Sequence, residues 1–157
     1  MDREEALSRL RDAVASWYVD LGGTAEIAYA ACDVVAAGID GPAIVALAAV
    51  SVRAADVEVP WLLDDALREA GLTPRRKGTP GANEEGLRVV ARRTVAGSMT
   101  PRECTRWVFG RFGTYTNDLA DVLAGLDDYY DALDFIPETR EEVDALVLAE
   151  ARRLAMG

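Results

Sequence analysis

The sequence contains no histidine, a single lysine and only two cysteines in 157 residues. Without histidine, no imidazole can act as a general base, complete a Ser-His-Asp or Cys-His nucleophile, or ligate a metal. A ferritin-type di-metal centre needs Glu-x-x-His and is excluded in that form. Neither GxxxxGK[ST] nor GxGxxG occurs, so nothing in the sequence supports phosphate-loop nucleotide binding. We therefore expect no cofactor.

Long apolar runs are also missing. No run approaches the about 20 residues of a membrane-spanning helix. The opening stretch MDREEALSRLRD is charged throughout, where a signal peptide has an apolar core. Cys32 and Cys104 do not form the dense pattern of a disulfide framework, so we expect both to be reduced, buried thiols. These absences predict a cytoplasmic protein without membrane association.

Helical periodicity is present over nearly the whole length. In the first segment one apolar stripe comprises Leu7, Leu10, Val14, Trp17, Tyr18 and Leu21. Capping residues, glycines and prolines then divide the chain into predicted helices at 3–21, 24–38, 43–50, 60–70, 84–96, from Thr100 onward, 117–133 and 139–154. No segment alternates with a period of two. We therefore predict an all-α fold, a single compact bundle of seven or eight helices with no sheet.

One segment resembles a linker. Residues 73–83, TPRRKGTPGAN, contain two prolines, two glycines and three consecutive cations. This composition is typical of a mobile loop. We expect residues 1–157 to form a single helical domain, with this loop between two helical halves.

The second half carries a family resemblance. The stretches ARRTVAGSMTPRECTRWVFGRFG and LDDYYDALDFIPETREEVDALVLAEARRL resemble small helical actinobacterial proteins of uncharacterised function, over about residues 88–154. The resemblance implies a helical fold for this half and attaches no activity to it.

Charge is unevenly distributed along the chain. Residues 1–71 hold 13 acids and 5 bases, residues 72–113 hold 3 acids and 9 bases, and residues 114–157 hold 11 acids and 3 bases. The central arginines therefore either pair with acids of neighbouring helices or contact another molecule. The acidic ends favour a basic protein as partner, because opposite charge steers association.

The sequence DDYYD, residues 127–131, has the form of a DDxxD magnesium motif. In terpene synthases and prenyltransferases such carboxylates lie one helical turn apart and hold a metal that carries a diphosphate. Asp127 and Asp131 have that i, i+4 spacing. However, the chain is about half the usual length of those enzymes, and NDLADVLAG at 117–125 lacks the residues of a second metal motif. A small carboxylate-based, Mg²⁺-dependent enzyme stays an alternative.

Helix geometry gives these aspartates another interpretation. At about 100° per residue, the buried stripe of this helix is predicted to comprise Leu119, Val122, Leu123, Leu126, Tyr130 and Leu133. The acids then lie at the boundary of the stripe, and the adjacent tyrosine is a plausible interface anchor. The predicted partner-binding surface comprises Asp121, Asp127, Asp128, Tyr129, Asp131 and Asp134.

The central arginines and the aromatic residues carry two further predictions. The pairs Arg88/Arg92 and Arg102/Arg106 could place a basic helix-turn-helix around GSMTP, but Arg93 and Glu103 stand where that motif needs small and apolar residues. A nucleic-acid-binding regulator using residues 75–111 is therefore a second alternative, and nucleic acid is not the expected partner. Most aromatic residues are expected in the core, with Trp61 at the junction between the halves and a cluster of Trp107, Phe109, Phe112 and Tyr115 beside the acidic helix.

The sequence thus predicts a non-catalytic, acidic, helical protein-binding module. Its most concrete form is immunity- or antitoxin-like neutralisation of a basic partner protein.

Overall fold

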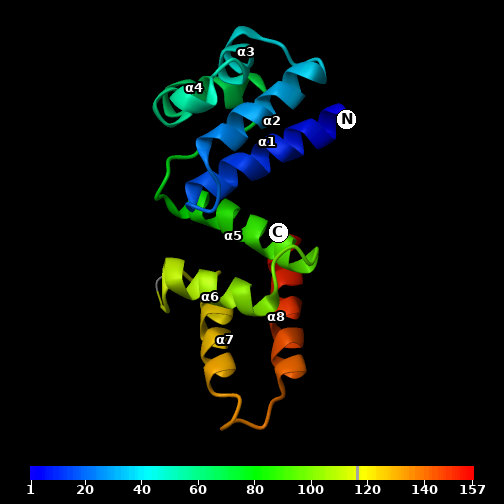
Figure 1. The fold of residues 1–157 in the computed structure, drawn as a ribbon, viewed down its shortest axis with the longest axis vertical. Coiled ribbons are helices and arrows are strands. Elements are labelled where there is room, and N and C mark those ends of the chain that lie inside the picture. Colours follow the sequence, from blue (N-terminus) through cyan, green and yellow to red (C-terminus); the bar gives the residue numbers. More distant parts are fainter. Residues whose placement is uncertain (116) are drawn as a thin grey trace. The chain divides into compact units, whose positions relative to one another are not determined.

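The computed structural model describes residues 1–115 and 117–157 (Figure 1). Over these residues the chain forms eight α-helices and one short 3-10 helix, and contains no strand. The prediction of an all-α fold is confirmed. None of the helices in the described part of the chain is both long enough and apolar enough to cross a membrane.

The chain divides into two compact units, Met1–Gly86 and Leu87–Gly157. We call these unit 1 and unit 2. The division falls inside a helix, whereas the sequence analysis placed the boundary between two halves in the loop at 73–83.

Unit 1 is built from four helices, the 3-10 helix and the beginning of a fifth helix. In chain order they are α1 Arg3–Tyr18, α2 Thr24–Ala36, α3 Pro42–Ala48, η1 Val52–Ala54, α4 Ala55–Glu69 and the first turns of α5 Pro80–Val95. Helix α2 packs against α1, α3 and α4, so it is the central helix of this unit. Its buried face is formed by small and branched apolar residues, which allow close helix packing: Ile27, Ala28, Ala30, Ala31 and Val34.

Some helix ends in unit 1 are capped by side chains that are distant in sequence. The N-terminus of α3 has Gly41 as its cap and lacks a local side-chain acceptor. Instead, the carboxylate of Glu69, at the end of α4, accepts hydrogen bonds from the N–H groups of Ala43 and Ile44. This satisfies two of the orphan donors of α3 and suits the positive end of its dipole. Periodicity alone could not have indicated this cap.

Unit 2 contains the rest of α5 and three further helices, α6 Pro101–Phe112, α7 Asp121–Asp131 and α8 Arg140–Ala155. Helices α7 and α8 are joined by a short connection and lie side by side, and α6 packs on both (Figure 1). The predicted capping box at the start of α6 is present, with the Thr100 hydroxyl accepting from the Glu103 N–H and the Glu103 carboxylate accepting from the Thr100 N–H.

The linker-like segment is held against α1. The Arg75 N–H donates to the Tyr18 hydroxyl at 2.9 Å, and Lys77 pairs with Asp20 and lies 4.8 Å from the centre of the Trp17 ring. Helix α5 begins at Pro80, four residues earlier than predicted, because proline is favoured in a first helical turn. The backbone of Arg75 and the side chain of Lys77 therefore hold this segment at the end of α1.

Candidate functional site

Asp127 is the structural centre of the acidic helix. It is only 8% exposed. Its Oδ1 accepts from Arg102 Nη1 at 2.6 Å and from the Thr105 hydroxyl at 3.0 Å. The other guanidinium nitrogen, Nη2 of Arg102, donates to Asp131 Oδ1 at 2.9 Å. One arginine of α6 thus binds both carboxylates that bear the i, i+4 spacing of the DDxxD motif.

The buried face of α7 differs from the predicted one. It comprises Leu123, Ala124, Leu126, Asp127 and Tyr130, whereas Val122, predicted to be buried, is 51% exposed. The predicted helix began at residue 117, but α7 begins at Asp121. The face is rotated toward Asp127 because Arg102 and Thr105 supply the charge and the hydrogen bonds that burial of a carboxylate requires.

Tyr130 extends the same network to α8. Its hydroxyl donates to Asp144 Oδ1, and the guanidinium groups of Arg102 and Arg140 lie 5.0 and 5.6 Å from the centre of its ring. Burial and the hydrogen bond to the Asp144 carboxylate raise the pKa of the Tyr130 hydroxyl well above its ordinary value. The hydroxyl therefore stays protonated and acts as a donor at neutral pH.

The contacts of Arg102 argue against a magnesium site at Asp127 and Asp131. A divalent cation at Asp127 and Asp131 would have to displace the guanidinium of Arg102, which already neutralises both carboxylates. Within the ranges 1–115 and 117–157, no group of three or more acidic or cysteine side chains is arranged to hold a metal ion. The network joins α6, α7 and α8 and is structural.

The remaining residues of the predicted surface fall into two groups. Asp121 is half-buried and accepts from the Tyr115 N–H at 2.9 Å, so it fixes the segment before α7. Asp128, Tyr129 and Asp134 are exposed at the end of α7 and in its connection to α8. The exposure predicted for Tyr129 is confirmed.

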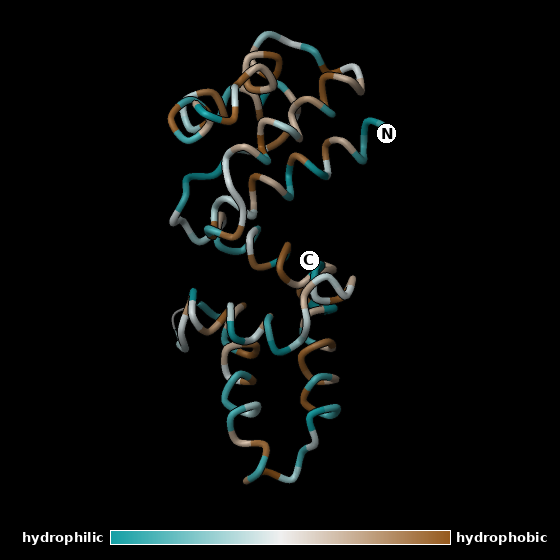
Figure 2. Tube along the Cα trace, in the orientation of Figure 1, coloured by the Kyte–Doolittle hydropathy of each residue, from teal (hydrophilic) through white to brown (hydrophobic). Residues whose placement is uncertain are grey.

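Phe135 is 89% exposed in the same connection and was not among the predicted surface residues. Hydrophobic residues are visible there beside hydrophilic ones (Figure 2). Phe135 lies between the end of α7 and Pro137. The sequence DFIP, which follows the last aspartate of the helix, indicates an apolar residue outside a helix. We define the hairpin surface as Asp128, Tyr129, Asp134 and Phe135.

A second exposed aromatic residue lies in unit 1. Trp61, expected to fill the junction between the halves, is instead 84% exposed. Its neighbours Val57 and Pro60 on α4 are also exposed, and we define these three residues as the α4 surface. Helix α4 begins at Ala55, directly after η1, so Pro60 lies inside the helix and Trp61 lies on its outer face. The exposed acids of the same helix segment are Asp56, Glu58, Asp64 and Asp65.

The predicted aromatic cluster before α7 is only partly buried. Trp107 and Phe112 are half-buried and form an edge-to-face pair with ring centres 5.9 Å apart. Phe109 is exposed and Tyr115 is 94% exposed, so the prediction of a core position is wrong for both. Tyr115 has a φ of 62°, in the left-handed region.

The arginines proposed for nucleic acid are largely engaged within the chain. Arg88 donates from Nη1 to the carbonyl of Leu154 at 2.7 Å, and Arg102 binds Asp127 and Asp131. In each of the pairs Arg88/Arg92 and Arg102/Arg106, one arginine therefore binds another group of unit 2. Arg106 is exposed.

The two cysteines are free, but only Cys104 is buried as expected. Cys32 is exposed and donates from its thiol to the carbonyl of Ala48, so the prediction of burial is wrong for it. Burial raises the pKa of the Cys104 thiol. A buried, protonated thiol is unreactive, so Cys104 is a packing residue.

Comparisons with family models, with curated proteins and with solved structures gave no match. Function is therefore inferred from the arrangement of side chains alone. The features that call for an explanation beyond folding are the hairpin surface and the α4 surface.

Proposed function

We propose that this chain is a non-catalytic, cytoplasmic protein-binding module whose partner is a basic protein. One observation carries the proposal: Phe135 in the connection between α7 and α8, and Trp61 on α4, are 89% and 84% exposed, and each lies among carboxylates in the sequence. Around Phe135, residues 128–142 hold six acids and one base. Around Trp61, residues 56–65 hold four acids and no base.

Solvent exposure of these rings has a clear energetic consequence. A large aromatic side chain that a partner buries gains about 25 cal/mol for each Å² of apolar area removed from water. Aromatic residues dominate the binding energy of many interfaces, particularly at the centre of a polar rim. The surrounding carboxylates would attract a cationic partner before contact and disfavour an acidic one.

Neutralisation of a basic protein, in the manner of an immunity protein or antitoxin, is the most concrete form of this function. A basic active-site or nucleic-acid-binding surface would supply the complementary charge. The hairpin surface is the primary candidate, because its acids and its aromatic residues lie within eight consecutive residues at the end of α7 and in the connection that follows. Asp127 and Asp131 hold that connection in place by anchoring the end of α7 to α6.

Site-specific photocrosslinking in the native host tests the proposal. A benzophenone-bearing phenylalanine analogue would replace Phe135 or Trp61, and Tyr115 would be the matched control because it is an exposed aromatic residue outside both surfaces. We expect a discrete adduct with one protein of net positive charge from position 135, from position 61 or from both.

The control separates specific capture from general stickiness. The adduct should be absent from position 115, and an adduct formed at position 135 should decrease strongly when Asp128→Lys and Asp134→Lys are introduced together. Equal labelling from all three positions, an acidic protein in the adduct, or insensitivity to the charge reversal would reject the proposed function.

A further inference from the structure

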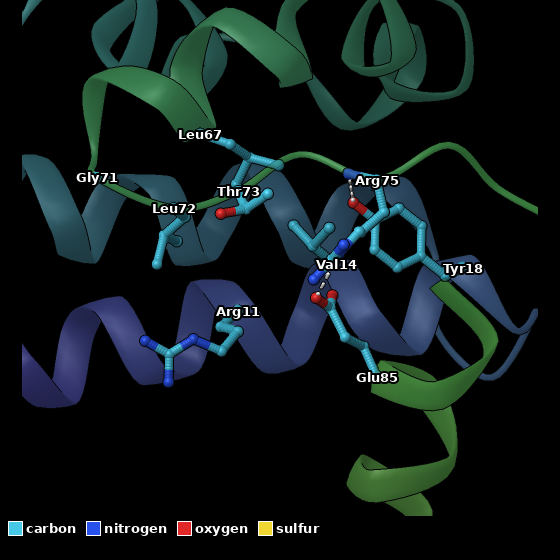
Figure 3. A pocket seen from close by; sticks show the side chains of 9 residues that line it. All are labelled: Arg11, Val14, Tyr18, Leu67, Gly71, Leu72, Thr73, Arg75 and Glu85. Carbon is cyan, nitrogen blue, oxygen red and sulfur yellow. Dashed lines mark hydrogen bonds and ion pairs between the residues drawn. The ribbon is translucent and has the colours of Figure 1, made fainter. Parts of the chain in front are cut away.

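Unit 1 contains a pocket that is unrelated to the hairpin surface. It has a volume of about 250 Å³ and lies between α1, the end of α4, the linker after α4 and the first turns of α5 (Figure 3). Its apolar wall is formed by Val14, Leu67 and Leu72. Such a wall suits the hydrocarbon part of a small ligand.

The polar groups at this pocket are mainly donors. The Tyr18 oxygen accepts the N–H of Arg75, but the hydrogen of the Tyr18 hydroxyl has no acceptor among the described residues. Across 1–115 and 117–157, neither the Thr73 hydroxyl nor the Arg11 guanidinium makes a hydrogen bond or an ion pair. Three donors of this pocket thus lack an acceptor among the described residues; Tyr18 is buried, whereas Arg11 and Thr73 are exposed to solvent.

Tyr18 is suited to donate because it is almost completely buried. Burial raises the pKa of its hydroxyl above the ordinary value, and the nearby carboxylates of Glu85 and Asp64 add to the rise. The hydroxyl therefore keeps its hydrogen at neutral pH. A buried donor that lacks an acceptor is costly, and a ligand oxygen would remove that cost.

The charge of the lining favours an anion. Arg75 Nε pairs with Glu85 Oε1 at 3.0 Å, so these two charges neutralise each other. Arg11 is left as the cation of the pocket without a counter-charge in its lining. The lining thus contains two arginines and one glutamate, and the carboxylate of Asp64 lies near Tyr18 outside the lining.

We propose that this pocket binds a small carboxylate with a short apolar or monocyclic body. The carboxylate would accept from Arg11 and from the Thr73 and Tyr18 hydroxyls, and the body would contact Val14, Leu67 and Leu72. The volume is below the range of about 300–1,000 Å³ that accommodates drug-sized ligands, which limits the ligand to a smaller molecule.

Titration of the full chain with phenylacetate, followed by amide NMR, tests this site. We expect saturable shifts confined to the linker around Leu72, Thr73 and Arg75 and to the facing part of α1. Phenylacetamide has nearly the same shape but no charge, and it should bind at least about tenfold more weakly. Arg11→Gln should weaken phenylacetate binding by a similar factor, and Thr73→Val by a smaller one.

Arg3→Gln is the matched control, since Arg3 lies on the same helix, is exposed and is outside the pocket. It should leave the affinity unchanged. Absence of saturable shifts at millimolar phenylacetate, equal binding of phenylacetamide, or equal effects of Arg3→Gln and Arg11→Gln would overturn the proposal. None of these outcomes depends on whether the hairpin surface binds a protein.

Discussion

At the scale of single residues, the aspartates of DDYYD have different roles despite their identical chemistry. Asp127 is buried and bonded to Arg102 and Thr105, whereas Asp128 is exposed and available to a partner. One step along a helix rotates a side chain by about 100°, which is enough to move it from a packed interface to solvent. The two residues therefore form a matched pair for experiment.

Asp127→Ala should lower the free energy of unfolding by about 2–4 kcal/mol, because it leaves the partly buried guanidinium of Arg102 with an incomplete set of acceptors. Asp128→Ala should change it by less than about 0.5 kcal/mol, as is usual for exposed positions. Urea denaturation followed by circular dichroism measures both. Similar values for the two variants would contradict the structural role of Asp127.

Tyr130 gives the network a dependence on pH. Because the pKa of its hydroxyl is raised in the folded state, its stabilising contribution is fully present below the unfolded value of about 10. That contribution is lost as the pH rises above that value, since only the unfolded chain then releases the proton.

Tyr130→Phe should therefore cost about 1.5–3 kcal/mol at neutral pH, where the hydrogen bond to charged Asp144 is lost. The difference between wild type and variant should shrink as the pH is raised beyond about 10. Urea denaturation across this pH range provides the measurement, and a difference that stays constant would show that Tyr130 titrates normally in the fold.

At the scale of secondary-structure elements, close packing requires a glycine at position 86, because a side chain there would overlap neighbouring atoms. A Cβ atom on Gly86 of α5 would lie 2.3 Å from Val19 Cγ1 and 3.0 Å from the carbonyl oxygen of Ala15. These contacts lie within unit 1. A Cβ atom on Gly110 of α6 would meet no atom within 4 Å.

Gly86→Ala should therefore destabilise the protein by about 1–3 kcal/mol through overpacking. Gly110→Ala should stabilise it by about 0.5–1 kcal/mol, because alanine loses less backbone entropy than glycine in a helix. Thermal or urea unfolding of the two variants reports the sign directly. Stabilisation by both substitutions would show that α5 does not approach Val19 as described.

The helices themselves were largely predictable from the sequence, because capping residues, glycines and prolines act locally. The capping box of Thr100 and Glu103 is an example. The orientation of α7 was not predictable, because burial of Asp127 depends on Arg102, a residue 25 positions away. The same limit applies to Trp61 and Tyr115, whose aromatic character favoured a core position although the helices around them leave both exposed.

For the predicted surface, the structure reports which residues are exposed, and the role of the surface stays a prediction. Exposure of Asp128, Tyr129 and Asp134 agrees with the predicted surface, while Asp121, Asp127 and Asp131 bind groups of unit 2. Phe135 was missed because residues outside helices have no periodicity from which exposure could be inferred.

At the scale of the whole molecule, the uneven charge distribution has two explanations that hold for different residues. Part of the cationic segment neutralises the chain's own acids, as Arg102 does with Asp127 and Asp131 and Arg75 does with Glu85. The acids of the hairpin surface and the acids next to the α4 surface exceed the bases beside them, and the formal net charge is −10. A long-range attraction for a basic protein follows from this excess.

The association rate of the crosslinked partner protein with charge-reversed variants tests the central claim most directly. Asp128→Lys with Asp134→Lys changes the formal net charge from −10 to −6, and so does the control pair Asp40→Lys with Asp118→Lys, at exposed positions outside both surfaces. We predict that the hairpin pair slows association at low salt by about tenfold or more, and that the control pair has a much smaller effect. Equal slowing by the two pairs would mean that net charge alone governs binding and would contradict a partner site at the hairpin surface.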